Sequence, residues 1–425
     1  MMNTNTFALK GLFLDTPTPG QLRCREGFLV CEGGVCAGVF DALPERYDGI
    51  AVHDYSGRLI IPGMSDLHLH APQYSYCGTA MDLELLEWLQ SYTYPEEARY
   101  ADPEHAKAYY EIFVRDLKHT ATTRAAIFAT IHPDATMELM RQLDEAGLGA
   151  YVGKLNMDRN CPDYYSEGTP ENGEAETRRW LDACKAANFD RVYPILTPRF
   201  TPSVTDAYME KIGELSREYG VAMQSHLSEN LSEIEWVKAL CPDAKHYADT
   251  YARYGLFGGS CPTIMAHCIY CPEEENQLMK NGHVFIAHCP TSNENVIAGI
   301  SPAARYLREG YEIGLGSDVA GGHTLDLFAV MAAAVQVSKL RWCYVDQSEK
   351  PLTIPEALYM ATAGGGRFFG KVGLFEEGYA FDAVVVDDSA NRNLRAFTPL
   401  ERIERCAYLG GMKVEAKFVD GKQIV

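Results

Sequence analysis

Basic residues are scarce in this sequence, and long apolar runs are absent. The 425 residues include 38 Lys and Arg against 58 Asp and Glu, which gives a formal net charge of −20 at pH 7. Duplex DNA and anionic membranes attract clustered basic side chains, so this charge argues against either as a partner. The longest apolar stretch, residues 328–335, is far shorter than the roughly 20 residues that cross a bilayer. Small neutral substrates remain compatible with the composition.

Neither a disulfide framework nor a secretory signal is indicated. Thirteen cysteines, an odd number, are scattered over a chain long enough to bury a core without covalent cross-links. Cys268 and Cys271 form a C-x-x-C pair, which we interpret as core residues. The N-terminal segment has no basic stretch followed by an apolar one. These features predict a reducing, cytoplasmic location.

Several enzyme signatures are missing as well. The sequence contains neither the H-E-x-x-H of a metalloprotease helix nor the cytidine-deaminase pattern of H-x-E with a later P-C-x-x-C. It also contains no G-x-S-x-G elbow, no P-loop and no G-x-G-x-x-G, since Gly314 and Gly316 lack the third glycine. Nicotinamide and ATP chemistry therefore have no support.

The spacing of apolar residues divides the chain into three stretches. Near both ends, short β-type runs alternate with turn residues, whereas in the middle short apolar strands alternate with longer amphipathic helices. The middle pattern is typical of βα units. We therefore expect an α/β protein of two domains. Residues 63–370 form the larger one, and residues 1–62 together with 371–425 form a small composite β-sandwich.

The middle region contains eight candidate strands. They are residues 65–69, 125–129, 150–155, 192–196, 221–225, 263–266, 284–287 and 313–316. Helical patterns lie between them, for example over residues 102–118, 134–146 and 203–219. Eight strands with intervening helices predict a TIM-type (β/α)8 barrel.

Residues that can bind metals stand at the ends of these strands. His68 and His70 close the first, and His226, His267, His288 and Asp318 follow the fifth to the eighth. The carboxyl ends of barrel strands meet on one face, where active sites lie. Side chains two apart on a strand share a face, so His68 and His70 can both point inward. Three histidines and one aspartate match a catalytic zinc-type site with an open position.

Each of these residues also has an ordinary structural explanation. A single H-x-H pair can serve as core hydrogen-bonding histidines, as can His226. Asp318 in Gly-Ser-Asp could be a turn residue or a helix cap. Glu229, three residues after His226, could be a first-turn glutamate favoured by the helix dipole. The hypothesis of a metal site depends on their repeated coincidence with strand ends.

The sequence resembles the amidohydrolase superfamily and, within it, the guanine deaminase family. The superfamily opening is Pro-Gly, an acidic residue and H-x-H on the first strand, here within residues 61–70. More specific similarities lie in residues 71–74 (H-A-P-Q when read from His70), 199–200, 225–230, 265–267, 288–293 and 314–322. The resemblance spans nearly the whole chain. Thr291 stands where the family often has Asn, and residues 268–269 also vary.

This resemblance implies hydrolysis of guanine at C2 to xanthine and ammonia by a metal-activated hydroxide. The implied metal ligands are His68, His70, His226 and Asp318, with one Zn²⁺ per chain, or Fe²⁺ in its place. A bound metal lowers the pKa of water from about 16 toward ~7. The implied catalytic residues are Glu229, Asp318 and His267. Glu229 carries protons to N3 and to ammonia, Asp318 accepts the proton of the water, and His267 orients that water or polarises the tetrahedral adduct rather than binding metal.

Recognition of the purine is expected at its polar edges. A guanidinium fits the O6 carbonyl, so Arg199 is the expected reader of O6, and Gln73 can serve the N3 side. Phe200 either stacks on the ring or packs in the core. His70, Glu229 and Asp318 are expected to contact substrate too. Tyr74, Tyr76 and Trp88 follow the H-x-H pair in the sequence, and we expect them near the mouth of the same site.

Other readings remain open. A related substrate such as 8-oxoguanine, another aminopurine or a triazine would use the same catalytic residues. An alternative from a different class of function is a catalytically inactive barrel that serves as a scaffold. Lys154 ends the third expected strand, where binuclear relatives carry a carboxylated lysine, but Glu229 fits a mononuclear site. We therefore expect Lys154 to be structural or ion-paired. The family also suggests a homodimer.

Overall fold

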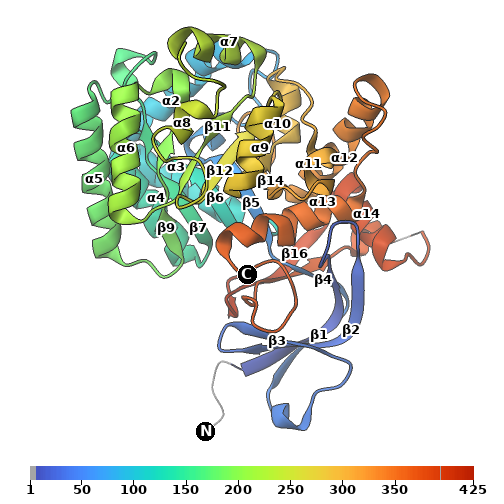
Figure 1. Ribbon diagram of the computed structural model, residues 1–425. Helices are drawn as coiled ribbons and strands as arrows, with labels where there is room; N and C mark the ends of the chain where they lie inside the picture. Colours follow the sequence, from blue (N-terminus) through green and yellow to red (C-terminus); the bar gives the residue numbers. More distant parts are fainter. Residues whose placement is uncertain (1–5, 393) are drawn as a thin grey trace.

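The computed structural model describes residues 6–392 and 394–425 and shows a mixed α/β architecture (Figure 1). Strands from both ends of the chain lie side by side below a larger region of alternating strands and helices. The sheet built from both termini was expected from the β-type runs at the two ends.

The terminal region is one seven-stranded sheet with the order β17-β16-β15-β4-β1-β2-β3. Its strands are β1 (Thr6–Asp15), β2 (Arg23–Glu32), β3 (Val35–Phe40), β4 (Ala51–Pro62), β15 (Ala383–Asp387), β16 (Lys413–Val419) and β17 (Lys422–Gln423). One face buries an apolar cluster that includes Leu9, Phe13, Ile60 and Phe418. The composite unit of both termini is therefore present, and its description as a sandwich stays a prediction.

Glycine turns close two hairpins of this sheet. Gly33 and Gly34 have φ of 59° and 90°, and they join β2 to β3. Gly421 follows Asp420 between β16 and β17 with φ of 75°. Positive φ is costly for residues with a Cβ, so these positions favour glycine.

The central region contains two parallel four-stranded sheets, with the orders β5-β6-β7-β9 and β11-β12-β13-β14. Their strands are β5 (Met64–His70), β6 (Thr122–Phe128), β7 (Gly149–Gly153), β9 (Val192–Pro194), β11 (Met223–Leu227), β12 (Thr263–His267), β13 (Phe285–His288) and β14 (Ile313–Leu315). Each of the eight expected strands overlaps one of these. A further short pair is β8 (Leu155–Asn156) with β10 (Thr197–Pro198).

Backbone hydrogen bonds connect the two sheets at both edges. On one side, Leu196 forms an isolated parallel bridge with Met223. On the other side, the amide of Asp318 donates to the carbonyl of His68 and the amide of His70 donates to that of Val319, both at 2.8 Å. The ends of β5 and β14 are thereby held together.

Helices alternate with these strands. They are α1 (Leu85–Trp88), α2 (Tyr94–Ala98), α3 (Pro103–Lys118), α4 (Pro133–Ala146), α5 (Pro170–Ala187), α6 (Asp206–Tyr219), α7 (Leu231–Leu240), α8 (Asp249–Ala252), α9 (Glu273–Gly282), α10 (Pro290–Asn295), α11 (Ala303–Arg308), α12 (Leu327–Tyr344), α13 (Ile354–Tyr359) and α14 (Pro399–Leu409).

Side-chain caps set several helix starts. Asp102 accepts the amide of Glu104 at the start of α3, which begins with Pro103. The expected helix from residue 203 instead begins at Asp206, because the side chain of Thr205 caps it and the preceding residues form a short 3₁₀ turn. Helix α14 within the terminal region was not anticipated.

Arginine links the terminal sheet to the central region. Arg124 on β6 is buried, and its guanidinium donates to Asp382 at 2.8 and 3.0 Å and to Asp420 at 2.6 Å. Buried bidentate pairs of this kind fix geometry, and removing one partner leaves an uncompensated charge. The terminal sheet is therefore joined to β6 by specific ion pairs.

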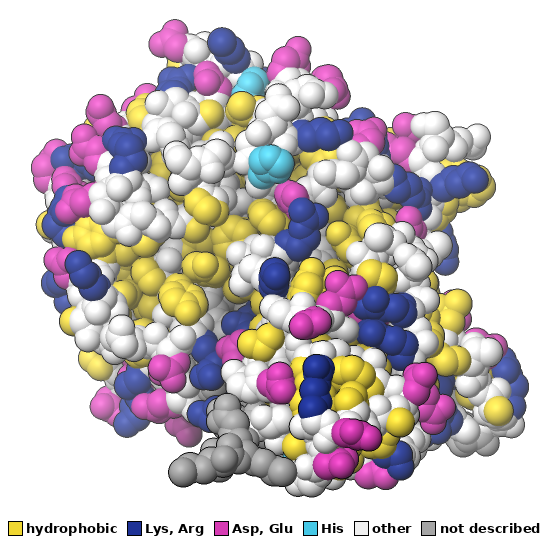
Figure 2. Space-filling model, turned by 60° about the horizontal axis from the view of Figure 1, so that its bottom comes forward, with side chains coloured by type: hydrophobic (Ala, Val, Ile, Leu, Met, Phe, Trp, Pro, Cys, Tyr) yellow, Lys and Arg dark blue, Asp and Glu magenta, His cyan; other side chains and the backbone are white. Residues whose placement is uncertain are grey.

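The surface and the thiols agree with the expectations from composition. On the face shown in Figure 2, basic and acidic side chains are interspersed rather than gathered by sign. All thirteen cysteines lie in the described part of the chain, and each is a free thiol. Within that same part, no helix is both long and apolar enough to cross a membrane.

Candidate active site

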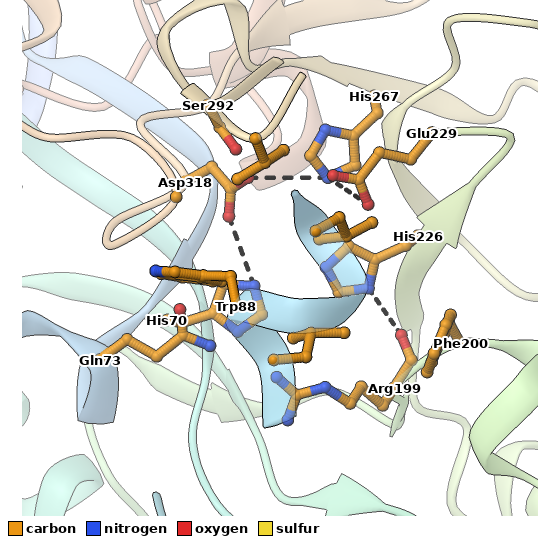
Figure 3. A pocket seen from close by; sticks show the side chains of 14 residues that line it. His70, Gln73, Trp88, Arg199, Phe200, His226, Glu229, His267, Ser292 and Asp318 are labelled. Carbon is orange, nitrogen blue, oxygen red and sulfur yellow. Dashed lines mark hydrogen bonds and ion pairs between the residues drawn. The ribbon is translucent and has the colours of Figure 1, made fainter. Parts of the chain in front are cut away.

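Five of the six residues expected at strand ends as candidate metal ligands lie close together in the structure, and four of them, His70, His226, His267 and Asp318, are labelled in Figure 3. His288, the last residue of β13, is not among the five. His68 and His70 lie at the end of β5, and His226 is the second-to-last residue of β11. His267 is the last residue of β12, and Asp318 follows β14. All five side chains are at most 9% exposed.

Their ligand atoms form two overlapping groups. The nitrogens of His68, His70 and His226 lie within 4.8 Å of one another, and so do the ligand atoms of His68, His267 and Asp318. Asp318 Oδ1 lies 3.2 Å from Nε2 of His68 and 3.4 Å from Nε2 of His70. His68 thus belongs to both groups, and the Asp318 carboxylate faces the H-x-H pair.

Hydrogen bonding leaves ring nitrogens free for a metal. The Nδ1–H of His226 donates to the backbone carbonyl of Arg199 at 2.6 Å, and because a carbonyl only accepts, Nε2 keeps its lone pair. Both ring nitrogens of His68 and Nδ1 of His70 are buried without a hydrogen-bond partner in residues 6–392 and 394–425. Such orphaned imidazole nitrogens beside a carboxylate fit a transition-metal site.

Electrostatics favours the ligand forms of these groups. Burial lowers the pKa of His70 to about 4 and that of His226 well below its usual value, so both rings are neutral. Burial by itself would raise the pKa of Asp318, but His68, His70 and His267 outweigh it and hold that pKa well below its usual range. Neutral imidazoles and a charged carboxylate are the states that bind metal.

Asp66, two residues before His68, accepts hydrogen bonds from the backbone on both sides of the same cluster. Its Oδ1 accepts the amides of His68 at 3.2 Å and of Ser317 at 2.9 Å. Burial raises the pKa of this carboxyl to about 7. One side chain therefore ties β5 to the segment that carries Asp318.

Glu229 and His267 form the second part of the site. Glu229 Oε2 lies 3.5 Å from His267 Nε2, which in turn lies 3.6 Å from Asp318 Oδ2. The opposite nitrogen of His267, Nδ1, donates to Asn293 Oδ1 at 2.8 Å. His267 is therefore held in one orientation between two carboxyl groups. Asn293 was not recognised from the sequence as its partner.

Two residues of the site adopt left-handed backbone conformations. His267 has φ of 73° and Asp318 has φ of 48°, both uncommon for residues with a Cβ. Each stands where its strand ends. Such conformations cluster at functional sites, where the surrounding structure maintains them.

Glu229 is a buried acid with a strongly perturbed pKa. Burial raises its pKa well above the usual value, and the neighbouring carboxyls of Glu233 and Asp318 raise it further. Glu233 accepts the backbone amides of Glu229 at 3.1 Å and Asn230 at 3.2 Å, which holds its carboxylate against the backbone of Glu229. A carboxyl that holds its proton near neutral pH can serve as a general acid.

A pocket opens over these residues. Its lining includes the catalytic candidates His70, His226, Glu229, His267 and Asp318, the expected substrate contacts Gln73, Arg199 and Phe200, and Leu85, Trp88, Leu89, Ser292, Val296 and Gly321. Every residue expected to contact substrate therefore faces one pocket (Figure 3).

The aromatic residues expected near the mouth separate into two kinds. Trp88 lines the pocket, whereas Tyr74 donates to Asp116 at 2.9 Å and Tyr76 donates to Thr93 at 2.9 Å, both away from it. Phe200 lines the pocket and also packs edge-to-face against Trp236, with ring centroids 6.1 Å apart. Phe200 is thus a wall residue that also packs against a neighbouring ring, and its stacking on the purine stays a prediction.

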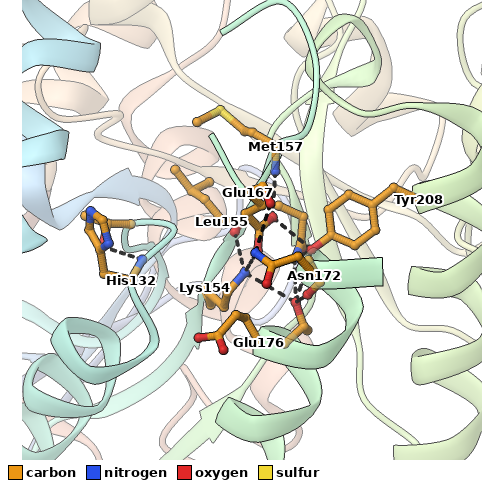
Figure 4. A network of polar contacts seen from close by, with 12 residues as sticks. His132, Lys154, Leu155, Met157, Glu167, Asn172, Glu176 and Tyr208 are labelled. Atoms are coloured by element: carbon orange, nitrogen blue, oxygen red, sulfur yellow. Dashed lines mark hydrogen bonds and ion pairs between the residues drawn. The ribbon is translucent and has the colours of Figure 1, made fainter. Parts of the chain in front are cut away.

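Lys154 is ion-paired, as expected. Its Nζ contacts Glu167 and donates to the carbonyl of Leu155 at 3.0 Å (Figure 4). Glu167 also accepts the hydroxyl of Tyr208 at 2.8 Å. The lysine belongs to a buried structural network, and it is in neither metal-binding group.

Glu97 was missed from the sequence. It lies in α2, is fully buried, and pairs with Arg199 through oxygen–nitrogen distances of 2.6 and 3.2 Å. It also accepts Nε2 of Gln73 at 2.7 Å. The two polar residues expected to read the purine are therefore connected through one carboxylate.

Comparison with known proteins agrees with this geometry. The amidohydrolase family model matches residues 59–424. A guanine deaminase of Mus musculus is 37% identical over 385 residues, covering 86% of this chain and 82% of that protein. The structure of a guanine deaminase from C. acetobutylicum with guanine bound in its active site is 44% identical, with a TM-score of 0.95, covering 99% and 100% of the two chains. The E. coli guanine deaminase structure is 30% identical, with a TM-score of 0.88, covering 98% and 99%.

Proposed function

The chain belongs to the amidohydrolase family, and on that premise we propose that it is a guanine deaminase, hydrolysing guanine at C2 to xanthine and ammonia. One observation carries the proposal. The His68, His70, His226 and Asp318 cluster adjoins one pocket, which is lined by His70, His226 and Asp318 together with the acid Glu229 and the polar residues Gln73 and Arg199. Metal-type ligands, a protonated acid and purine-edge donors are the parts that this reaction needs.

The proposed metal ligands are His68, His70, His226 and Asp318, with one ion per chain. Their unpartnered nitrogens and charged carboxylate fit a divalent transition metal, and imidazole with carboxylate suits zinc, with iron as the alternative. A bound ion would supply a Lewis acid that makes water acidic enough to react at neutral pH.

The protein's own groups would move the protons. Asp318 accepts a proton from the attacking water, and His267, oriented by Asn293, positions that water between two carboxyl groups. Glu229 holds its proton because it is buried beside other carboxyls, and it delivers that proton to N3. Glu229 next accepts the proton that remains on the attacking oxygen and passes it to the C2 amino group, which leaves as ammonia, and the proton held by Asp318 then restores the acid form of Glu229.

Recognition of guanine would come from the opposite wall of the pocket. Arg199 presents a planar guanidinium suited to the O6 carbonyl, and Gln73 offers an amide toward the N3 side. Phe200 supplies an aromatic wall for the ring, and His70 and Asp318 lie beneath it. These assignments rest on the lining of the pocket and on the chemistry of the purine.

We also propose a closed (β/α)8 barrel for residues 63–370, with residues 1–62 and 371–425 as the composite β-sandwich domain. The bonds that join the two parallel sheets at both edges support the barrel. A homodimer and a cytoplasmic location belong to the same proposal. Light scattering on the purified protein would test the dimer.

A substrate panel tests the proposed function. Absorbance would follow conversion of guanine to xanthine, with 8-oxoguanine, adenine and cytosine assayed alongside, and metal analysis would give the ion and its amount per chain. Guanine should be deaminated with the highest kcat/KM. Preference for 8-oxoguanine or another amine would reassign the substrate, and a metal-free chain that releases no ammonia would indicate an inactive barrel.

Replacing Arg199 with Lys should lower kcat/KM for guanine by about 10- to 100-fold. Lysine keeps the positive charge near Glu97, but it loses the planar fork that matches a carbonyl and a carboxylate together. Steady-state kinetics would measure the loss. Arg402→Lys is the matched control, because Arg402 pairs bidentately with Asp388 in the terminal region. Unchanged kcat/KM in Arg199→Lys would show that another residue reads O6.

Replacing Glu233 with Gln should move the alkaline limb of the pH–rate profile to lower pH. The Glu233 carboxyl helps to raise the pKa of Glu229, so its removal lowers that pKa and Glu229 loses its proton at a lower pH. The profile of kcat/KM between pH 5 and 10 would show the shift. If the alkaline limb does not move, the ionisation that causes it is not that of Glu229.

A further inference from the structure

Glu97 occupies an unusual position behind the purine-binding wall. Its carboxylate accepts four hydrogen bonds, from Gln73 Nε2 at 2.7 Å, Tyr165 OH at 2.8 Å, and Arg199 Nη1 and Nη2 at 2.6 and 3.2 Å. Gln73 and Arg199 line the pocket, whereas Glu97 does not. A carboxylate has roughly four lone-pair sites, so Glu97 has none left for a substrate.

The helix that carries Glu97 restrains Arg199 from a second direction. Tyr94, one helical turn earlier in α2, places its ring under the guanidinium, with Arg199 Cζ 5.2 Å from the ring centroid. Residues three apart on a helix share a face. Helix α2 therefore fixes the guanidinium both in its plane, through Glu97, and perpendicular to it, through Tyr94.

Gln73 is fixed by two partners of opposite kind. Its Nε2 donates to Glu97, and its Oε1 accepts the amide of Ala320 at 3.3 Å. Each contact requires the same orientation of the amide. The remaining N–H of Gln73 and the remaining N–H groups of Arg199 are thus held in place before any ligand arrives.

We propose that Glu97 is a positioning residue that sets the enzyme's preference for a purine with an oxygen at C6. By holding the Arg199 fork and the Gln73 amide together, it keeps N–H donors aimed at the site where a carbonyl oxygen would lie. This role rests on the proposed function and extends it to the choice of substrate. Preorganised donors reject an analogue that lacks the matching acceptor, because the donors are then left unpaired.

The four donors around Glu97 are satisfied only if both of its carboxylate oxygens accept hydrogen bonds. In Glu97→Gln, one end of the amide becomes a donor. If the new NH₂ group takes the place of Oε1, it faces Gln73 Nε2 and Arg199 Nη2. If it takes the place of Oε2, it faces Arg199 Nη1 and the Tyr165 hydroxyl. Either choice places donor against donor at one tip of the guanidinium. The substitution conserves volume, so the change is one of polarity rather than of packing.

The test compares guanine with 2-aminopurine, which has the same ring and C2 amino group but no oxygen at C6. In the metal-loaded Glu97→Gln protein, KM for guanine should rise by about 10- to 100-fold. The Ki of 2-aminopurine as a competitor should change by less than about threefold, and kcat by less than about tenfold. The ratio of Ki for 2-aminopurine to KM for guanine should therefore fall.

Asp388→Asn is the matched control. Asp388 is a buried carboxylate paired bidentately with Arg402 in the terminal region, so its loss also disrupts a buried ion pair. This variant should lose stability in thermal unfolding and keep the wild-type ratio. If Glu97→Gln lowers stability in the same way and keeps the wild-type ratio too, Glu97 is a structural residue and the proposal is wrong.

Tyr165→Phe gives a second, milder variant. It removes one donor to Glu97, and Tyr165 itself does not line the pocket. Its ratio should fall by about 2- to 10-fold. If Glu97→Gln does not fold, an unchanged ratio in Tyr165→Phe overturns the proposal. A wild-type protein that does not deaminate guanine would refute the proposed function and this inference with it, whereas an active wild type with unchanged variant ratios refutes the role of Glu97 alone.

Discussion

Replacing Glu229 with Gln is expected to lower kcat for guanine by about 10²–10⁴-fold while metal and guanine still bind. Glu229 is 4% exposed, and its carboxyl lies 3.5 Å from His267 Nε2. An amide of the same size keeps the shape of the pocket but cannot carry a proton to N3 or to ammonia. Glu229 belongs to neither group of metal-type ligands, so the metal content should be retained.

Glu235→Gln is the matched control for this result. Glu235 lies on α7, six positions after Glu229, and is an exposed residue that pairs with Lys238. Its replacement should leave kcat unchanged. Metal analysis and a binding titration would accompany the kinetics, because loss of metal would give a false impression of lost acid catalysis. Near-normal turnover in a metal-loaded Glu229→Gln protein would remove Glu229 from the mechanism.

Replacing Asp318 with Asn is expected to abolish activity, a loss of more than about 10⁴-fold, together with most of the bound metal. The Asp318 carboxylate lies 3.2 and 3.4 Å from the two imidazoles of the H-x-H pair and holds a pKa well below its usual value. An amide carries no charge and binds metal weakly. The same substitution removes the group that accepts the proton of the attacking water.

Asp326→Asn controls for the loss of a partly buried aspartate in the same part of the chain. Asp326 caps α12 through the amide of Phe328, and Asn is an equally good cap, so activity and metal content should stay unchanged. Metal per chain and ammonia release would be measured on both variants. An active, metal-containing Asp318→Asn protein would exclude Asp318 from the site.

The strand-end residues could be predicted because residues of metal-binding type recur at the ends of successive strands. His68, His226, His267 and Asp318 each stand where a short apolar run stops, and parallel strands bring such positions together. The expected strands overlap those of the structure for the same reason, since a buried parallel strand is a compact apolar run. Their exact bounds differ by at most three residues, because backbone pairing rather than hydrophobicity sets where a strand stops.

Glu97 shows what the sequence could not reveal. Its partners Gln73, Tyr165 and Arg199 stand 24, 68 and 102 positions away, and nothing in the local Tyr-Pro-Glu-Glu segment distinguishes it from the exposed glutamates of other helices. Asn293 and Asp66 are similar cases, since each acts by contacting a residue in a distant segment of the chain, His267 and Ser317 respectively. Helix α14 was missed because it is a single amphipathic stretch between β-type runs.

Arg199 contributes to two tasks through chemically separate parts. Its guanidinium faces the purine pocket, whereas its main-chain carbonyl accepts the Nδ1–H of His226. Every amino acid carries that carbonyl, so the residue type at this position can diversify without loosening the imidazole that we propose as a metal ligand. A lineage could thus exchange one heterocycle for another by altering a single side chain, while the hydrolytic centre beneath it is inherited intact.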